Sequence, residues 1–222
     1  MAMQSDAHAR FTSRRRSLRL LTPLLLAGPA MFSPRVASGQ QPSLVPTPSQ
    51  TEGPFYPKTL PADRDADLTQ VAGRPVKALG TVLYFSGRVL ARDGRILPGT
   101  IVELWQCDNY GRYHHAGDDG VPRDDNFQGY GVATTDAEGR YAFKTIRPVP
   151  YTGRPPHMHI RLRHANAPPL TTQLYIAGDV VGADGVLMAS PRGTLAKLTM
   201  ALAPAPGREA GALAGSYEFV LP

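Results

Sequence analysis

The sequence predicts an all-β protein, a β-sandwich with long active-site loops. About seven or eight short segments alternate apolar with polar residues, as half-buried strands do. Glycine and proline number 22 each among the 222 residues, a composition typical of many turns between short strands. One long stretch, about 107–130, has no strand or helix pattern. Because loops of more than about 15 residues are uncommon in compact domains unless they are functional, this loop is a candidate functional segment.

The strand patterns follow one another from residue 81 to the end of the chain. TVLYFSGRVLA (81–91) precedes the turn RDGRILPG, and TIVELWQ (100–106) follows it. After the long loop, GVATT and YAFKTI flank the turn DAEGR, a sequence that predicts a β-hairpin. Further strands are expected at 157–163, 171–177 and 216–221, whereas TLAKLTMAL (194–202) fits either a helix or a strand.

Residues 1–39 have the features of an export signal. Arg14, Arg15 and Arg16 precede a short apolar run, and small residues up to Gly39 suit cleavage by a signal peptidase. SRRRSLR resembles the twin-arginine export signal with Ser17 where Phe is usual, and an arginine-rich secretory signal is the alternative. The run is shorter than the roughly 20 residues of a membrane-spanning helix. The sequence therefore predicts a periplasmic protein without a stable membrane span.

Charge and cysteine content exclude several classes of site. The formal net charge is +6, but residues 1–39 hold six arginines and one aspartate, so they contribute +5 and leave +1 for the rest. Residues 40–222 thus have no excess of positive charge for binding nucleic acid. Cys107 is the single cysteine, so no intramolecular disulfide can form and a thiolate metal site is excluded.

The segment GRPPHMHI (153–160) contains the first candidate metal ligands. Pro155 and Pro156 favour a loop end, and in the strand after them His157 and His159 share one face. A half-solvated strand with no metal is the alternative reading of this segment alone. Aspartates in the long loop could complete a site, and so could two tyrosines, Tyr113 and Tyr151. A phenol with an ordinary pKa near 10 binds only a strongly acidic metal such as Fe(III).

Several segments taken together resemble the intradiol ring-cleavage dioxygenases, with the protocatechuate type nearest. They are GRVLARDGRILPGTIVELWQCDNYGRYHH, NFQGYGVATTDAEGRYAFKTIRPVPY, RPPHMHI and TTQLYIAGD. TPSQTEGPFYP resembles that type's N-terminal segment near the substrate mouth. The resemblance covers about residues 46–221. After the export signal at 1–39 and a Pro/Ser-rich lead-in at 40–50, it implies a catalytic β-sandwich domain at 51–222.

The resemblance assigns roles to individual residues. It implies non-haem Fe(III) bound by four ligands, namely Tyr113, Tyr151, His157 and His159. Arg154 matches the family's active-site arginine and Gln173 a glutamine beside the iron site. The implied substrate-binding residues are Thr51, Glu52, Gly53 and Pro54. Trp105 is expected in the core, Cys107 as a small buried filler, and His114 and His115 away from the metal.

The family chemistry implies a catechol-type substrate and O2. The catechol would bind the iron, Tyr151 would leave the metal and take up a substrate proton, and Arg154 would stabilise negative charge on the ring. Cleavage between the two hydroxylated carbons would give a muconate-type diacid. The family also leads us to expect a homo-oligomer.

Two departures from the family pattern bear on the substrate. Val149 stands where Gly is usual, and only six positions separate Tyr151 from His157, without the Trp and Arg that hold the substrate carboxylate in protocatechuate enzymes. Uncharged catechols, including alkyl-substituted ones or hydroxyquinol, are therefore expected to be better substrates than protocatechuate. The cations that could otherwise receive a carboxylate are Arg112, Arg123 and Lys144. The helical N-terminal domain of catechol dioxygenases has no counterpart in this sequence.

Two alternatives remain at the level of sequence. A non-catalytic, transthyretin-like binding module would have similar strand-turn-strand segments, because fold alone does not establish function. The second alternative is an enzyme that binds zinc or copper through the two histidines alone. A module would have no need of the combined Tyr, Arg and His set, and metal analysis separates the remaining readings.

Overall fold

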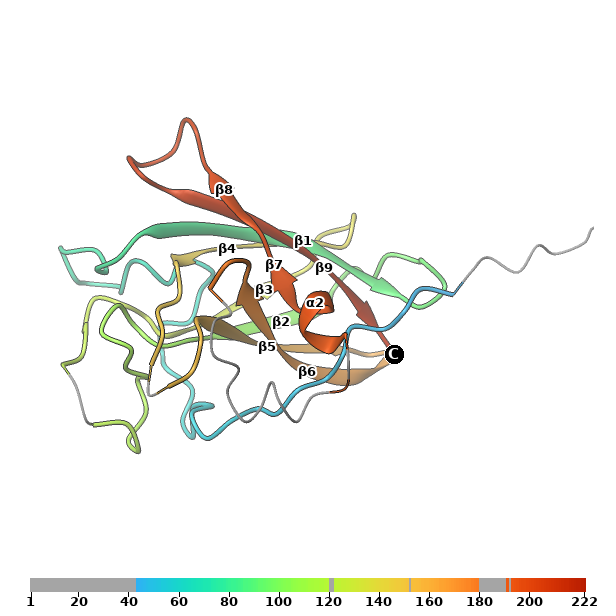
Figure 1. The fold of residues 1–222 in the computed structure, drawn as a ribbon, viewed down its shortest axis with the longest axis horizontal. Helices are drawn as coiled ribbons and strands as arrows, with labels where there is room; N and C mark the ends of the chain where they lie inside the picture. The colour runs from blue at the N-terminus through green and yellow to red at the C-terminus, as the bar shows by residue number, and fades with distance from the viewer. Residues whose placement is uncertain (1–42, 120–121, 152, 180–190, 192) are drawn as a thin grey trace, which may run out of the picture. The chain divides into compact units, whose positions relative to one another are not determined.

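The computed structural model describes residues 43–119, 122–151, 153–179, 191 and 193–222. In these residues nine strands form two facing sheets, and one short helix, α2, lies outside them (Figure 1). The first sheet has the order β4–β1–β9–β8, with β4 at Arg140–Ile146, β1 at Val82–Ala91, β9 at Leu213–Leu221 and β8 at Leu202–Pro204. The second has the order β3–β2–β5–β6–β7, with β3 at Tyr130–Thr134, β2 at Ile101–Trp105, β5 at His157–His164, β6 at Ala167–Ile176 and β7 at Thr199–Met200.

The predicted β-sandwich is confirmed by this arrangement. The predicted export signal at 1–39 lies outside the described residues. Within the described part of the chain, we find no helix with the length and apolar character needed to cross a bilayer.

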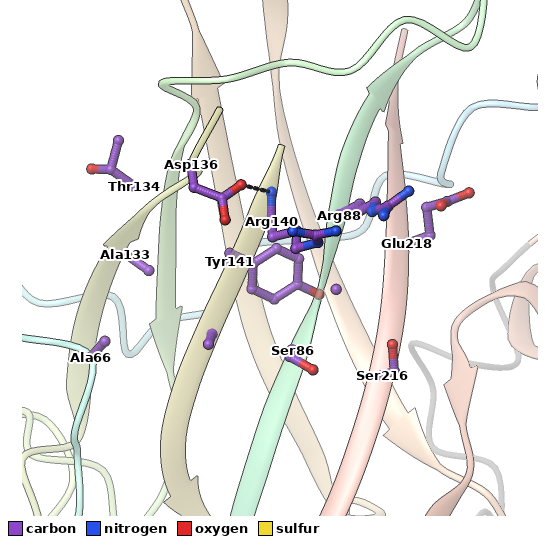
Figure 2. A pocket seen from close by; sticks show the side chains of 12 residues that line it. Ala66, Ser86, Arg88, Ala133, Thr134, Asp136, Arg140, Tyr141, Ser216 and Glu218 are labelled. Atoms are coloured by element: carbon purple, nitrogen blue, oxygen red, sulfur yellow. Dashed lines mark hydrogen bonds between the residues drawn. The ribbon is translucent and has the colours of Figure 1, made fainter. Parts of the chain in front are cut away.

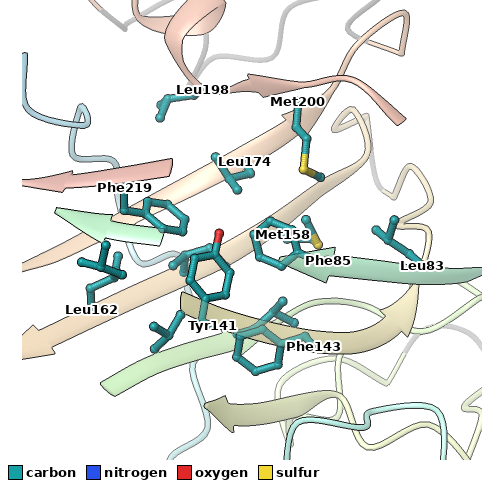
Figure 3. Close-up of a cluster of buried hydrophobic side chains, with 14 of the residues drawn as sticks. Leu83, Phe85, Tyr141, Phe143, Met158, Leu162, Leu174, Leu198, Met200 and Phe219 are labelled. Carbon is teal, nitrogen blue, oxygen red and sulfur yellow. The ribbon is translucent and has the colours of Figure 1, made fainter. Parts of the chain in front are cut away.

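The core lies between the two sheets and follows the alternation of the strands. In β5, Met158, Ile160 and Leu162 are fully buried and pack against side chains of the first sheet, such as Phe85 of β1 and Phe219 of β9 (Figure 3). Because successive residues of a strand face opposite ways, the intervening residues of β5 point to the outer face of the second sheet. That outer face carries the candidate metal ligands.

The outer face of the second sheet is covered by the chain that precedes β1. The segment from Leu44 to Tyr56 runs beside both sheets, with Thr47 N–H bonded to the carbonyl of Val220 at 3.0 Å and Gln50 N–H to that of Thr171 at 2.9 Å. Side chains of this segment then pack on the sheet itself. The covering explains why His157 and His159, although on an outer face, are each only 1% exposed.

Two local expectations are corrected by the sheet pairing. The predicted hairpin around DAEGR is wrong, because β3 pairs with β2 and β4 pairs with β1, so the turn carries the chain from one sheet to the other. The turn itself forms, with the Asp136 carboxylate accepting the N–H groups of Glu138 and Arg140. A turn sequence fixes the local reversal of the chain but not the partner that each strand finds. The ambiguous segment 194–202 forms helix α2 (Thr194–Lys197) followed by β7 and the start of β8.

Candidate metal centre

Strand register assembles the centre on the outer face of β5. His159 lies directly opposite Trp105 of β2 on one side and Gln173 of β6 on the other. His157 lies opposite Tyr175 of β6. Directly opposite residues in a sheet share a face, so these five side chains form one polar and aromatic patch.

Three possible donor atoms converge at this patch. The Tyr113 hydroxyl lies 3.0 Å from His159 Nε2 and 3.4 Å from His157 Nε2, and the two Nε2 atoms are 3.2 Å apart. Atoms at these separations can all lie at about 2 Å from one central point, which is the distance of a metal–nitrogen bond. The fourth predicted ligand, Tyr151, has its ring centroid 5.2 Å from that of Tyr113.

The two histidine rings are oriented by different contacts. His157 Nδ1 lies 2.8 Å from the carbonyl oxygen of Pro155, and because a carbonyl can only accept, this nitrogen donates. Nε2 is then the ring nitrogen of His157 that faces the centre. His159 stacks on Trp105 with ring centroids 4.9 Å apart. Gly53, which has a φ of +73°, approaches so closely that a Cβ there would lie 3.2 Å from His159 Cε1.

Tyr113 is held firmly by the long loop that carries it. Its backbone N–H donates to the Asp118 carboxylate at 2.8 Å, its ring stacks on Phe55 at 4.7 Å, and its side chain is 2% exposed. The loop in turn is organised by the fully buried carboxylate of Asp108, which accepts the N–H groups of Tyr110, Arg112 and Asp124. The loop aspartates thus serve as acceptors for backbone groups.

The backbone of Tyr151 has few hydrogen bonds, although its ring contacts Phe55, Tyr113 and His157. Its backbone N–H and carbonyl are paired only with the carbonyl and N–H of Arg154, at 3.3 and 2.7 Å, in the described backbone. The side chain is half-buried. Gly111 allows the two tyrosine loops to touch, because a Cβ at this position would lie 3.1 Å from Tyr151 Cβ.

Arg154 and Gln173 form a connected pair beside the ligands. Arg154 Nη2 donates to Gln173 Oε1 at 3.0 Å and lies 3.4 Å from the Tyr175 hydroxyl. Gln173 Nε2 donates in turn to the carbonyl of Thr51 at 2.8 Å. The covering segment, the arginine and strand β6 are therefore linked through the side chain of Gln173.

The protonation of the donors indicates which metal suits them. Burial and the neighbouring charges of His157 and Arg154 hold the pKa of His159 well below its ordinary value, so the ring is neutral and able to ligate. Burial raises the pKa of Tyr113 well above 10, and burial also raises that of Tyr151. Only a strongly acidic cation would deprotonate such phenols. No cluster of three His, Cys, Asp or Glu side chains occurs in the described residues, so a metal held here depends on tyrosine.

A pocket of about 550 Å³ opens beside Tyr151 and Arg154. Its wall is formed mainly by prolines and glycines of the 147–156 loop and of the turn after β6, and it also contains Arg147 and Asp179. A separate hollow of about 840 Å³ lies over β1, β4 and β9 (Figure 2). That hollow contains the opposed charges of Arg88, Arg140, Asp136 and Glu218 and none of the candidate ligands. A smaller cavity of about 130 Å³ also borders the centre, with Tyr113, Trp105 and Phe55 in its wall.

The structure brings the candidate ligands, Arg154 and Gln173 together, and it places other expected residues as follows. Glu52 of the expected substrate-binding segment forms an ion pair with Arg161. Cys107 is buried, and burial raises its pKa to about 12, as suits a filler. His114 lies 3.6 Å from the carboxylate of Asp108. Trp105 is buried, as expected, but as a stacking partner of His159.

Sequence reasoning missed the roles of Phe55, Tyr175 and the Arg147–Asp179 pair. Phe55 and Tyr175 touch the centre from segments far apart in the chain, and no local pattern connects them with it. Arg147 was not among the cations named as carboxylate receptors, whereas Lys144 pairs with Glu209 and Arg123 with Asp125.

Comparison with known proteins gives consistent matches. A family model described as dioxygenase matches residues 51–222. The protocatechuate 3,4-dioxygenase beta chain of Burkholderia cepacia is 35% identical over 167 residues, 71% of this chain and 71% of that protein. Catechol 1,2-dioxygenase of Candida albicans is 34% identical over 152 residues, 59% of this chain and 47% of that protein. This chain thus spans about half the length of the catechol enzyme.

Solved structures agree with these sequence relatives. The dioxygenase domain of a dioxygenase–carbohydrate-binding protein fusion from Streptomyces sp. SirexAA-E is 29% identical with a TM-score of 0.59, covering 80% of this chain and 98% of that one. The 3-chlorocatechol 1,2-dioxygenase of Rhodococcus opacus is 24% identical with a TM-score of 0.63, covering 78% and 72%. The second match is a similarity of fold.

Proposed function

This chain belongs to the intradiol ring-cleavage dioxygenases, and on that basis we propose that it uses non-haem Fe(III) and O2 to cleave an uncharged catechol. Cleavage would fall between the two hydroxylated carbons and give a muconate-type product. The family membership makes the chain an oxidoreductase and argues against the alternative of a non-catalytic binding module.

One observation carries the proposal. The Tyr113 hydroxyl and the Nε2 atoms of His157 and His159 lie within 3.0 to 3.4 Å of one another on a buried face. Buried polar atoms so close together, two of them imidazole nitrogens, suit a shared cation better than an apolar core. Tyr151 beside them supplies a fourth donor. The two phenols favour Fe(III) over zinc or copper because a hard trivalent ion acidifies them most.

The residues of the chain supply positioning and proton transfer. Ferric iron bound there would act as a Lewis acid toward the phenols and the substrate hydroxyls. Tyr151, half-buried and with few backbone hydrogen bonds, is the tyrosine better able to turn away; as the phenolate, it would accept a proton from the catechol at its own oxygen. Arg154, oriented by Gln173, places a fixed positive charge beside the pocket in which the ring would lie.

Metal analysis and oxygen uptake test this function directly. Protein purified without added metal should contain about one iron per chain and show a visible absorption band from phenolate-to-iron charge transfer. It should consume O2 with catechol or 4-methylcatechol and form a diacid. Stoichiometric zinc in a colourless protein, or iron-loaded protein that leaves every catechol intact, would refute the proposal.

We also propose that the mature chain works in the periplasm after export by the twin-arginine route. The proposal is supported by the sequence SRRRSLR and by the small residues before Gln40. Replacing Arg14, Arg15 and Arg16 together with Lys keeps the charge but removes the arginine pair, and should leave the precursor in the cytoplasm. Fractionation of cells with an antibody to the mature domain measures this. Export of the Lys variant at the native level would contradict the route.

A further inference from the structure

The small cavity that borders the centre is lined by side chains with buried polar atoms. Its wall combines Phe55 and prolines of the chain before β1 with Trp105 at the end of β2 and with Tyr113 and Gln128 of the long loop. Trp105 is 1% exposed and Gln128 is 6% exposed. In the described residues, neither Nε1 of Trp105 nor Oε1 of Gln128 has a hydrogen-bond partner. The wall of the cavity thus contains a buried donor and a buried acceptor.

The orientation of the Gln128 amide follows from its other hydrogen bonds. Its Nε2 donates to the carbonyl of Asp65 at 3.0 Å and to that of Tyr130 at 2.9 Å. A reversed amide would place Oε1 against two carbonyl oxygens, which can only accept hydrogen bonds. The amide is therefore fixed with Nε2 toward these carbonyls, and Oε1 is the atom that still requires a donor.

A second buried glutamine shows how such an oxygen is satisfied elsewhere in the fold. Gln106 is fully buried, and its Nε2 donates to the carbonyls of Cys107 and Ile146. Its Oε1 accepts the hydroxyl of Thr145 at 3.0 Å. The two glutamines thus make the same kind of backbone bonds, and they differ in that Gln128 borders a cavity where Gln106 has a protein donor.

The chemistry of these atoms defines what the cavity can bind. An indole nitrogen only donates and an amide oxygen only accepts, so an occupant must offer both an acceptor and a donor. A further buried nitrogen of the same wall, Nε2 of His114, lies 3.6 Å from the carboxylate of Asp108, beyond hydrogen-bond distance. Water meets these needs, and about 130 Å³ has room for a small cluster, because one water occupies about 30 Å³ in the liquid.

The cavity is in contact with the centre on two sides. Tyr113, a candidate ligand, forms part of its wall. Trp105, also in the wall, stacks on His159 with ring centroids 4.9 Å apart and an angle of 13° between the rings. A molecule that holds the indole in place therefore also supports one face of the His159 ring.

We propose that this cavity is a binding site for a cluster of water molecules, which hydrogen-bond to Trp105 and Gln128 and so hold the indole against the ring of His159. Trp105 and Gln128 are then positioning residues. Buried polar groups without a protein partner are commonly satisfied in this way by ordered water. The water site depends only on the atoms of the cavity, whereas its role in positioning a metal ligand rests on the proposed function.

Crystals of the iron-loaded enzyme test the water site directly. Ordered water should lie within hydrogen-bond distance of Trp105 Nε1 and Gln128 Oε1. A second crystal under xenon pressure provides the contrast, because xenon enters dry apolar cavities. It should leave this cavity unchanged. A cavity without ordered water, or one that fills with xenon, would overturn the proposal.

The positioning role is tested with Gln128→Met, which removes the acceptor and keeps a side chain of similar length. Loss of a group that orients a metal ligand should weaken iron binding about tenfold, measured by competition with a chelator. The matched control is Gln106→Met, which also loses two bonds to backbone carbonyls but lies outside the cavity wall. It should keep the native affinity. Native affinity in Gln128→Met, or an equal loss in the control, would overturn the positioning role.

If Gln128→Met does not fold, Trp105→Phe replaces it. Phe keeps a ring to stack on His159 but lacks the N–H group, so this variant should lose the ordered water at that position and bind iron more weakly than the native protein. Native affinity in Trp105→Phe would overturn the positioning role. Native protein that binds no ferric iron would instead refute the proposed function, and water in its cavity would still establish the site.

Discussion

The two loops that supply tyrosines to the centre are built in different ways. The loop from Cys107 to Gly129 holds Tyr113 at 2% exposure and is stabilised by the buried carboxylate of Asp108 and the partly buried one of Asp118, which accept backbone N–H groups. The loop from Arg147 to Pro156 leaves Tyr151 half-buried, with backbone hydrogen bonds only to Arg154 in the described residues. Movement of Tyr113 would therefore disturb the hydrogen bonds of its loop, whereas Tyr151, whose ring contacts Tyr113 and His157, has fewer backbone hydrogen bonds to lose.

This difference separates a fixed ligand from a movable one. A carboxylate that accepts several backbone bonds is costly to disturb, because its partners would be left buried without acceptors. An isolated pair of backbone hydrogen bonds, such as the pair between Tyr151 and Arg154, is broken at little cost in free energy. The tyrosine that we propose as the proton acceptor, Tyr151, is therefore the one whose backbone is less constrained.

The largest effect is expected when the carboxylate of Asp108, which orders the first loop, is removed. Asp108→Ala deletes an acceptor of three backbone N–H groups and should lower the free energy of unfolding by about 3 kcal/mol, with most of the iron lost. Urea unfolding and metal analysis measure both effects. The control is Asp119→Ala, an exposed aspartate of the same loop, which should change neither. A stable, iron-replete Asp108→Ala variant would show that Tyr113 is held by other means.

Arg154→Lys probes the second loop. Lys keeps the charge but loses the planar donor set that reaches both Gln173 and Tyr175. We expect the iron to stay bound and kcat to fall about 100-fold. Steady-state oxygen uptake at saturating catechol gives kcat. Native turnover in the Lys variant would remove the guanidinium from the mechanism.

A direct comparison of Tyr113→Phe with Tyr151→Phe sharpens the contrast between fixed and movable ligand. Both variants should alter the visible band, because each loses one phenolate. Loss of the fixed ligand should weaken iron binding about tenfold more than loss of the movable one. Competition with a chelator measures the two affinities. Equal affinities, or the reverse order, would show that loop rigidity does not decide how much each tyrosine contributes.

The smallest expected effect is the acid sensitivity of the first loop. Burial alone would raise the pKa of Asp108, but the His114 ring 3.6 Å away and hydrogen bonds from backbone N–H groups outweigh it, so the pKa lies below its ordinary value. A depressed carboxylate stabilises the folded state above its unfolded pKa, about 3.9, and this stabilisation is lost as the pH falls through the folded pKa. Unfolding free energy should therefore drop by on the order of 1 kcal/mol per pH unit below pH 4. The Asp108→Asn variant should not show this loss of stability below pH 4. The same pH dependence of the unfolding free energy in the variant and the native protein would contradict the prediction.

Much of the centre could be predicted because its residues lie in short, contiguous motifs. GRPPHMHI places two histidines on one strand face, and the structure confirms that face and its burial on both sides. The family resemblance supplied Tyr113, Tyr151, Arg154 and Gln173, and the structure brings all four to the histidines. The stacking of Trp105 on His159 required the register of β2 against β5, which no local motif encodes.

The sequence by itself determined the alternating strands, the fold class and the ligand types, because these depend on which residues are neighbours along the chain. Only the tertiary structure decided that β3 and β4 enter different sheets, that the 44–56 segment buries the centre, and that Arg147 meets Asp179. The physical reason is that a period of two residues reports which face of a strand is buried but not which strand lies beside it. Contacts such as Arg147–Asp179 join residues 32 positions apart, so they exist only once both sheets have assembled.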